Sequence, residues 1–263
     1  MKAKNKTKLS LTAPSLALAL TLSLVAMGCR SHFELKGVER TRILIDSRYD
    51  GMPNEAGALL LAPYKQKVDS VMSPVLGEVT HYMAAGRPES NLSNLLADIL
   101  VWAAKDYGEE VVLGVYNVGG IRAALAQGKV TYGDVLDVAP FENKICFLTL
   151  SGEQLLELFT QIALRGGEGV SHGTQLVIDS NRKLVSARLN GHDIAPDSTY
   201  RVATIDYLAQ GNDQLEAFKK GTKLNSPQEE KNNTRYIIMN YFREQTAQGR
   251  KVSAQVEGRI VVE

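Results

Sequence analysis

Cysteine is scarce in this chain of 263 residues, which contains only Cys29 and Cys146. Two cysteines cannot build a disulfide framework or a zinc site made of several thiolates. Cys146 stands inside the apolar run at residues 145–150, where we expect it to behave as a small buried hydrophobic side chain. The cysteine content therefore argues against redox chemistry and against a cysteine-based metal site.

Histidine and net charge are also low. The four histidines are His32, His81, His172 and His192, and none stands in D-x-H or H-x-x-x-H spacing. A two-metal centre needs several histidines and carboxylates that converge on one point, so we predict no metal site in this chain. The formal net charge is +1, which argues against a nucleic-acid partner because nucleic-acid-binding domains are usually basic.

The longest apolar run lies near the N-terminus. Residues 1–8 are basic, residues 9–27 are apolar, and Cys29 follows, an order typical of a secretory signal peptide. We predict a signal peptide over residues 1–28 and lipidation of Cys29, as in a bacterial lipoprotein. The chain would then be anchored to a membrane of the cell envelope, facing the periplasm or the surface. Ala26 stands where the lipoprotein box prefers leucine, which leaves a simple signal peptide or an uncleaved anchor open.

Patterns typical of strands and of helices alternate irregularly through the rest of the chain. Apolar or alternating runs predict strands at residues 41–46, 77–83, 111–116, 144–150, 175–179, 184–189, 200–205 and 256–262. Helical spacing predicts helices at residues 59–76, from Ser90 or Asn91 to about 105, and at 153–165, 215–220 and 234–246, with a polar loop at 224–233. One pair of strands reads as a hairpin, so we predict a mixed α/β fold with helices layered on a mixed sheet.

The strand at residues 111–116 leads into a segment rich in ligand-binding groups. Asn117 follows the strand, a Gly-Gly pair lets the backbone turn sharply, and Arg122 offers a planar donor fork for phosphate or carboxylate. Phe141 and Asn143 stand just before the next apolar strand and add an aromatic face and a second amide. These groups suit a nucleotide, and none of them can activate water.

A second candidate segment follows the strand at residues 200–205 and contains Tyr207 and Asp213. Taken singly, each candidate has an ordinary structural explanation. Phe141 and Tyr207 could be core aromatics, and Arg122 could form a surface ion pair. Two aromatics, an arginine and an acid in ordered motifs together favour a binding site.

The motifs N-V-G-G-I-R, P-F-E-N, the Ser151-Gly152 step and Y-L-A-Q-G-N-D resemble the C-terminal, substrate-binding domain of the 5'-nucleotidases. The similarity covers nearly the whole chain after the leader. We therefore expect this domain over residues 63–263, preceded by an N-terminal extension over residues 29–62. Residues 63–77 resemble the helix that joins this domain to the catalytic one in the family.

The resemblance implies roles for single residues. Phe141 and Tyr207 match two aromatics that clamp the base, and stacking of this kind contributes about 1–3 kcal/mol per base. Asn143 matches an amide that contacts the base. Asp213 matches an acid that accepts hydrogen bonds from the ribose hydroxyls. Asn117 matches an amide near the sugar and the phosphate.

The phosphate contacts depart more from the family's pattern. Arg122 matches an arginine that reaches the phosphate. Many members carry a second arginine directly before the glutamate of an E-x-N segment, but here Pro88 takes that place and Arg87 stands one residue earlier. Asn212 replaces the second glycine of the family's G-G-D loop. The stacking residues are therefore better matched than the residues expected at the phosphate, of which Arg87 is one.

The complete enzymes of the family carry a two-metal domain with D-x-H and G-N-H-[DE] motifs, which do not occur in these 263 residues. We therefore predict a nucleotide- or nucleoside-recognition domain that has no cofactor of its own. It would hold the substrate for a dimetal phosphoesterase on a separate polypeptide, which would carry two divalent metals. A nucleotide-scavenging lipoprotein without an enzymatic partner is the alternative. An independent phosphatase is a third possibility, for which we expect no turnover.

Overall fold

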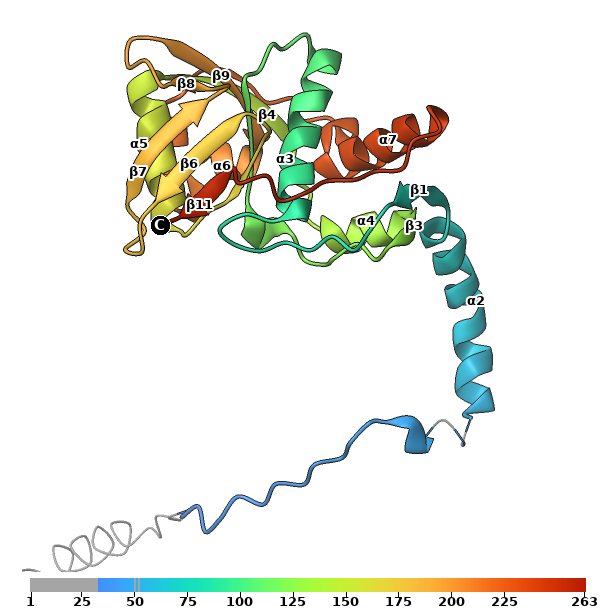
Figure 1. Ribbon diagram of the computed structural model, residues 1–263. Helices are drawn as coiled ribbons and strands as arrows, with labels where there is room; N and C mark the ends of the chain where they lie inside the picture. The colour runs from blue at the N-terminus through green and yellow to red at the C-terminus, as the bar shows by residue number, and fades with distance from the viewer. Residues whose placement is uncertain (1–32, 50, 52) are drawn as a thin grey trace, which may run out of the picture. The chain divides into compact units, whose positions relative to one another are not determined.

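The computed structural model describes residues 33–49, 51 and 53–263 (Figure 1). The predicted signal peptide and Cys29 lie outside these residues. The chain divides into two compact units, residues 1–55 and 56–263. In the first unit, the strand predicted at residues 41–46 is wrong, because these residues form no strand and Ile45 is 94% exposed. An apolar run becomes a strand only where a partner strand satisfies its backbone groups.

Helix α2 (Glu55–Met72) begins earlier than predicted and contains Pro63, which lies inside the helix and does not bound it. Every residue of α2 is at least partly exposed, including Leu59, Leu60 and Leu61. The helix ends before Pro74, because proline disfavours the helical conformation of the residue that precedes it. Within the described residues, no helix combines the length and apolar character that a membrane crossing needs.

A five-stranded sheet forms the centre of the second unit, with the strand order β10-β4-β9-β2-β5. Strand β4 pairs antiparallel with β9, whereas β2 pairs parallel with β9. The sheet is therefore mixed, as predicted. Its strands are β2 (Leu113–Tyr116), β4 (Ile145–Ser151), β5 (Gly169–Val170), β9 (Thr199–Ile205) and β10 (Thr222–Asn225).

Two smaller sheets complete the strands described. The predicted hairpin is confirmed, because β6 (Thr174–Ile178) pairs antiparallel with β7 (Leu184–Leu189). Strands β8 (His192–Asp193) and β11 (Ile260–Val262) flank this hairpin. Strand β1 (Val75–Val79) pairs with β3 (Gly128–Thr131). The last strand is shorter than predicted, and part of the loop predicted at residues 224–233 is strand β10, whose Asn225 pairs with Phe147 of β4.

The remaining α-helices are α3 (Asn91–Ala103), α4 (Tyr132–Val138), α5 (Gly152–Leu164), α6 (Asp206–Ala209) and α7 (Thr234–Ala247). Short 3-10 turns lie at η1 (Ser47–Tyr49), η2 (Ala104–Tyr107), η3 (Val118–Gly120), η4 (Asn212–Gln214), η5 (Glu216–Lys220) and η6 (Glu230–Asn232). Ser90 caps α3 by accepting a hydrogen bond from the Ser93 amide. Thr131 and Ser151 form capping boxes with the third residue of α4 and α5. These local signals explain why α3 and α5 begin close to the positions predicted from the sequence.

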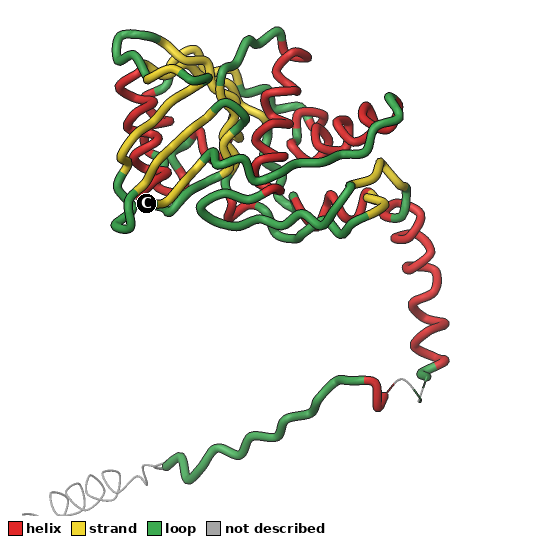
Figure 2. Tube along the Cα trace, viewed as in Figure 1, coloured by secondary structure: helices red, strands yellow, loops and turns green. Residues whose placement is uncertain are grey.

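Helices α3 and α5 both pack against strands of the central sheet (Figures 1 and 2). Helix α5 packs against β4 and β7, whereas α3 packs against β2 and β5. Cys146 lies in the core between these layers and is fully buried, as predicted. Burial raises the pKa of its thiol to about 11. Helix α7 packs against α3, α4 and β1 and so extends the same core.

Candidate functional site

One edge of the central sheet brings the two candidate segments together. Strands β2 and β9 run parallel, so their C-terminal ends meet at the same edge. Strand β4 runs antiparallel to β9, and its first residue, Ile145, pairs with Ile205 at the end of β9. Asn117, Asn143 and Tyr207 therefore emerge side by side, although they are far apart in the sequence.

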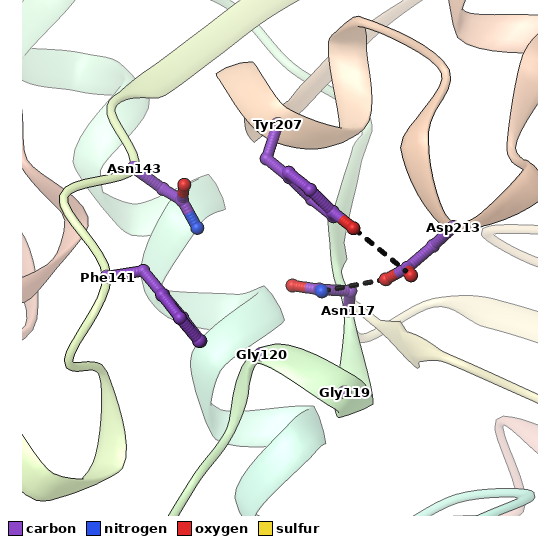
Figure 3. A pocket seen from close by; sticks show the side chains of 7 residues that line it. All are labelled: Asn117, Gly119, Gly120, Phe141, Asn143, Tyr207 and Asp213. Atoms are coloured by element: carbon purple, nitrogen blue, oxygen red, sulfur yellow. Dashed lines mark hydrogen bonds between the residues drawn. The ribbon is translucent and has the colours of Figure 1, made fainter. Parts of the chain in front are cut away.

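A pocket of about 220 Å³ opens at this edge (Figure 3). It is lined by Asn117, Gly119, Gly120, Phe141, Asn143, Tyr207 and Asp213. Five of the seven residues predicted as substrate contacts therefore border one cavity. The other two, Arg87 and Arg122, are not among its lining residues.

The rings of Phe141 and Tyr207 extend into the pocket from two different segments and leave a gap between them (Figure 3). Phe141 precedes β4, whereas Tyr207 lies on α6 directly after β9. Both rings are well exposed, at 48% for Phe141 and 37% for Tyr207. Neither is a core residue, so the alternative that these two aromatics merely pack in the core is wrong.

Asp213 is the carboxylate of the pocket. It accepts a hydrogen bond of 2.8 Å from the side-chain amide of Asn117 and one of 3.4 Å from the hydroxyl of Tyr207. Its backbone is left-handed, with φ of +56°, a conformation that aspartate tolerates better than most residues. Partial burial, and then the charge of Asp213, raise the pKa of Tyr207, so this hydroxyl stays protonated near neutral pH.

The Asn117 side chain lies close against the Gly-Gly turn. A Cβ atom at Gly120 would lie 2.5 Å from Oδ1 of Asn117, which is closer than carbon and oxygen can pack. Within the described residues, Oδ1 of Asn117 is buried without a hydrogen-bond partner. Buried oxygens of this kind are rare because they lose their bond to water. This atom is therefore a candidate acceptor for a ligand donor.

Behind the pocket lies a charged cluster that sequence reasoning did not find. Glu168 is buried and accepts hydrogen bonds from the Val118 amide and from Nε of Arg165, both at 2.6 Å. Arg165 also lies 3.5 Å from Asp213. The available signal is the run of glycines around Glu168, which by itself indicates only the end of a helix.

The two predicted phosphate contacts lie outside the lining of the pocket and contact different neighbours. Arg87 forms an ion pair with Glu168 and donates to the Gly167 carbonyl at 2.8 Å, so its guanidinium belongs to the cluster behind the pocket. Arg122 is exposed, and its Nη1 donates to the carbonyl of Gly119 at 3.3 Å. Gly119 lines the pocket, so Arg122 stands at the rim.

A metal centre would need other residues. In the part of the chain that the structure describes, no three histidine, cysteine, aspartate or glutamate side chains are grouped so that they could hold a metal ion. His172, for example, is exposed and contacts Glu257 at 2.9 Å through Nδ1. The pocket thus offers stacking faces, amides and one carboxylate, which are groups for binding.

Residues 75–220 match the protein family described as the 5'-nucleotidase, C-terminal domain. The match covers more than half of the chain and includes every residue that lines the pocket. The chain belongs to the 5'-nucleotidase family. The family predicted from the motifs is confirmed, and so is the mixed α/β fold.

The curated relatives are much longer than the region they share with this chain. The trifunctional nucleotide phosphoesterase YfkN of Bacillus subtilis is 31% identical over 187 residues, which are 65% of this chain and 12% of that protein. The 5'-nucleotidase of Vibrio vulnificus is 26% identical over 205 residues, which are 74% of this chain and 35% of that protein. The chain therefore spans about a third or less of these relatives.

Solved structures show the same relation. The 5'-nucleotidase precursor of Thermus thermophilus is similar with a TM-score of 0.68 and 27% identity, over 79% of this chain and 42% of that one. The NAD nucleotidase of Haemophilus influenzae is similar in fold, with a TM-score of 0.60, 19% identity and coverage of 97% and 46%. The described domain thus has the fold of one part of larger nucleotidases.

Proposed function

We propose that this chain is a nucleotide- or nucleoside-recognition domain that holds its ligand for hydrolysis by a dimetal phosphoesterase on a separate polypeptide. One observation carries the proposal: two exposed aromatic rings, Phe141 and Tyr207, border one pocket with a gap between them. A flat heterocycle in that gap would cover both rings. Base-to-ring stacking accepts different bases because every base has a π face.

The polar groups of the pocket suit the remaining parts of a nucleotide. Asn143 would meet the edge of the base. The carboxylate of Asp213 would accept hydrogen bonds from the ribose hydroxyls, and Oδ1 of Asn117, which has no partner among the described residues, would accept another. Arg122 at the rim would face the phosphate, where a planar guanidinium can form two hydrogen bonds.

The groups that line the pocket support binding better than hydrolysis. Asp213 is the one carboxylate among the lining residues, and it is already engaged with Asn117 and Tyr207. Hydrolysis by metal-bound hydroxide needs several ligands around two divalent ions, which the partner would supply. The exposed leucines of α2, which lie just before the segment that resembles the joining helix, are candidates for contact with that partner.

The location of the chain belongs to the same proposal. Lipidation of Cys29 after removal of residues 1–28 would place the pocket at a membrane of the bacterial cell envelope. Mass spectrometry of the mature protein tests this directly, since an acylated Cys29 would be the first residue. A mature protein that begins at another residue, or an unmodified Cys29, would contradict the anchor.

Calorimetry with AMP, UMP and adenosine tests recognition, and phosphate release from AMP with Mn²⁺, Co²⁺ or Zn²⁺ tests catalysis. We expect binding, and phosphate release only when a dimetal phosphoesterase domain is added. Binding without hydrolysis in the presence of such a domain would favour the alternative, a scavenging lipoprotein without an enzymatic partner. Metal-dependent phosphate release by the chain alone would show that the catalytic centre is not separate. No heat with any of the three compounds would refute nucleotide recognition.

A further inference from the structure

We propose that Arg235, in the first turn of α7, is a positioning residue that sets the place of the Phe141 ring. The inference rests on the proposed function for the identity of the ligand. The observation behind it is that Arg235 contacts the backbone segment that carries the ring. Arg235 does not line the pocket and would not touch the nucleotide.

The guanidinium of Arg235 binds three consecutive carbonyl groups. Its Nε donates to the carbonyl of Ala139 at 3.1 Å, and its Nη2 donates to those of Pro140 at 2.6 Å and Phe141 at 3.4 Å. The planar donor fork of arginine can hold several acceptors in a fixed arrangement. The backbone immediately before and at the stacking ring is therefore attached to α7.

The neighbouring residue, Thr234, holds the other end of the same segment. Its amide donates to the carbonyl of Asn143 at 2.9 Å, and its hydroxyl lies 3.2 Å from the same oxygen. Two adjacent residues of one helix thus bind four carbonyls of the segment 139–143. Both Phe141 and Asn143, which line the pocket, lie within this segment.

The burial of Arg235 indicates that these carbonyls are its main partners. Arg235 is only 9% exposed, and in the described part of the chain no acidic side chain forms an ion pair with it. Glu142 and Glu230 border the same surface pocket as Arg235, yet neither pairs with it. A buried charge is costly unless hydrogen bonds compensate it. Arg235 therefore needs the carbonyls of segment 139–143, and the segment in turn is held by Arg235.

The Phe141 side chain cannot hold this position by packing, because nearly half of it is exposed. Its place depends on the backbone, and α7 is a firm support because it packs against α3, α4 and β1. Without Arg235, segment 139–143 would sample more conformations, and a ligand would have to order it again on binding. Ordering costs of this kind reduce affinity, and we expect a loss of about tenfold.

The test uses the full chain with Arg235→Gln and Arg235→Lys. Arg243→Gln is the matched control, because Arg243 is on the same helix, exposed, and bonded to Asn240 through its side chain. NMR order parameters of the backbone amides of Phe141, Glu142 and Asn143 are measured without ligand, and adenosine affinity is measured by calorimetry. We expect lower order parameters in this segment and about tenfold weaker binding for Arg235→Gln, smaller effects for Arg235→Lys, and no change for the control.

A double-mutant cycle separates positioning from general stabilisation. If Arg235 acts through the ring, Arg235→Gln should weaken binding much less in a Phe141→Ala background than in the wild type. Equal losses in both backgrounds, unchanged order parameters at residues 141–143, or lower order parameters spread over the whole domain would overturn the proposal. So would failure of both Arg235 variants to fold. If the wild type binds no adenosine, the proposed function fails, whereas the order parameters still decide whether Arg235 fixes the segment.

Discussion

Replacing Phe141 with alanine should weaken nucleoside binding and leave the fold intact. The ring is 48% exposed and lies beside the pocket, outside the core. Its removal therefore loses one stacked face, worth about 1–3 kcal/mol, while the free energy of unfolding should change by less than about 0.5 kcal/mol. Since about 1.4 kcal/mol is a factor of ten, adenosine should bind roughly 5- to 150-fold more weakly.

Tyr207 allows a finer comparison, because its ring and its hydroxyl can be removed separately. Tyr207→Ala should weaken binding over the same range as Phe141→Ala. Tyr207→Phe keeps the ring and loses the hydroxyl, whose contact with Asp213 is long at 3.4 Å, so its effect should be about threefold or less. The order of affinities should be wild type, Tyr207→Phe, Tyr207→Ala.

Calorimetric titration with adenosine measures these differences, and thermal unfolding checks the fold of each variant. Tyr82→Ala is the matched control, because Tyr82 is a 62% exposed aromatic that does not line the pocket. Wild-type affinity in both Phe141→Ala and Tyr207→Ala, or an equal loss in Tyr82→Ala, would refute the stacking argument. A large loss of stability in Phe141→Ala would show that the ring also supports the fold.

Three further predictions concern buried or partly buried groups. Glu168→Gln should lower the free energy of unfolding by about 2 kcal/mol, because it removes the buried charge that faces Arg87 and Arg165, whose side chains are 33% and 20% exposed; denaturant unfolding measures this, and a loss under about 0.5 kcal/mol would contradict it. Hydrogen bonds from Arg201 are the main reason why the pKa of Glu109 lies below its usual 4.5 in the folded protein. The ionised Glu109 therefore contributes fully to the free energy of unfolding above about pH 4.5. This contribution is lost as the pH falls through the lower pKa of the folded state. Glu109→Gln should therefore flatten the fall in stability below pH 4.5, and an unchanged acid slope would contradict that sign. In a Cys29→Ser chain, Cys146 should react with a thiol reagent at pH 8 only after unfolding, because burial raises its pKa to about 11; rapid labelling of the native protein would show that the thiol is accessible.

Local sequence determined most of the elements, because their signals come from neighbouring residues. The caps Ser90 and Ser151 mark the starts of two predicted helices, and Thr131 caps α4, which the sequence analysis did not predict. The runs on either side of a polar turn form the hairpin of β6 and β7. Where a local signal needed a distant partner, it failed: residues 41–46 have the composition of a strand, but they pair with no strand and are exposed.

The motifs predicted the family and several residues of the pocket, including Phe141, Tyr207 and Asp213. They did not predict the contacts that hold these residues in place. These contacts join segments that are distant in the sequence. Arg165 pairs with Asp213, Glu168 is buried, and Arg235 donates hydrogen bonds to the carbonyls of residues 139–141. No local periodicity reports such contacts.

Which side chains this protein offers to a ligand thus follows from its sequence alone, because aromatic faces, amides and a carboxylate are properties of single residues. Only the tertiary structure decided that they border one cavity. The reason is the order β4-β9-β2 in the central sheet: the start of an antiparallel strand and the ends of two parallel strands fall at one edge. That placement depends on hydrogen bonds between strands up to about ninety residues apart in the chain, which no single segment encodes.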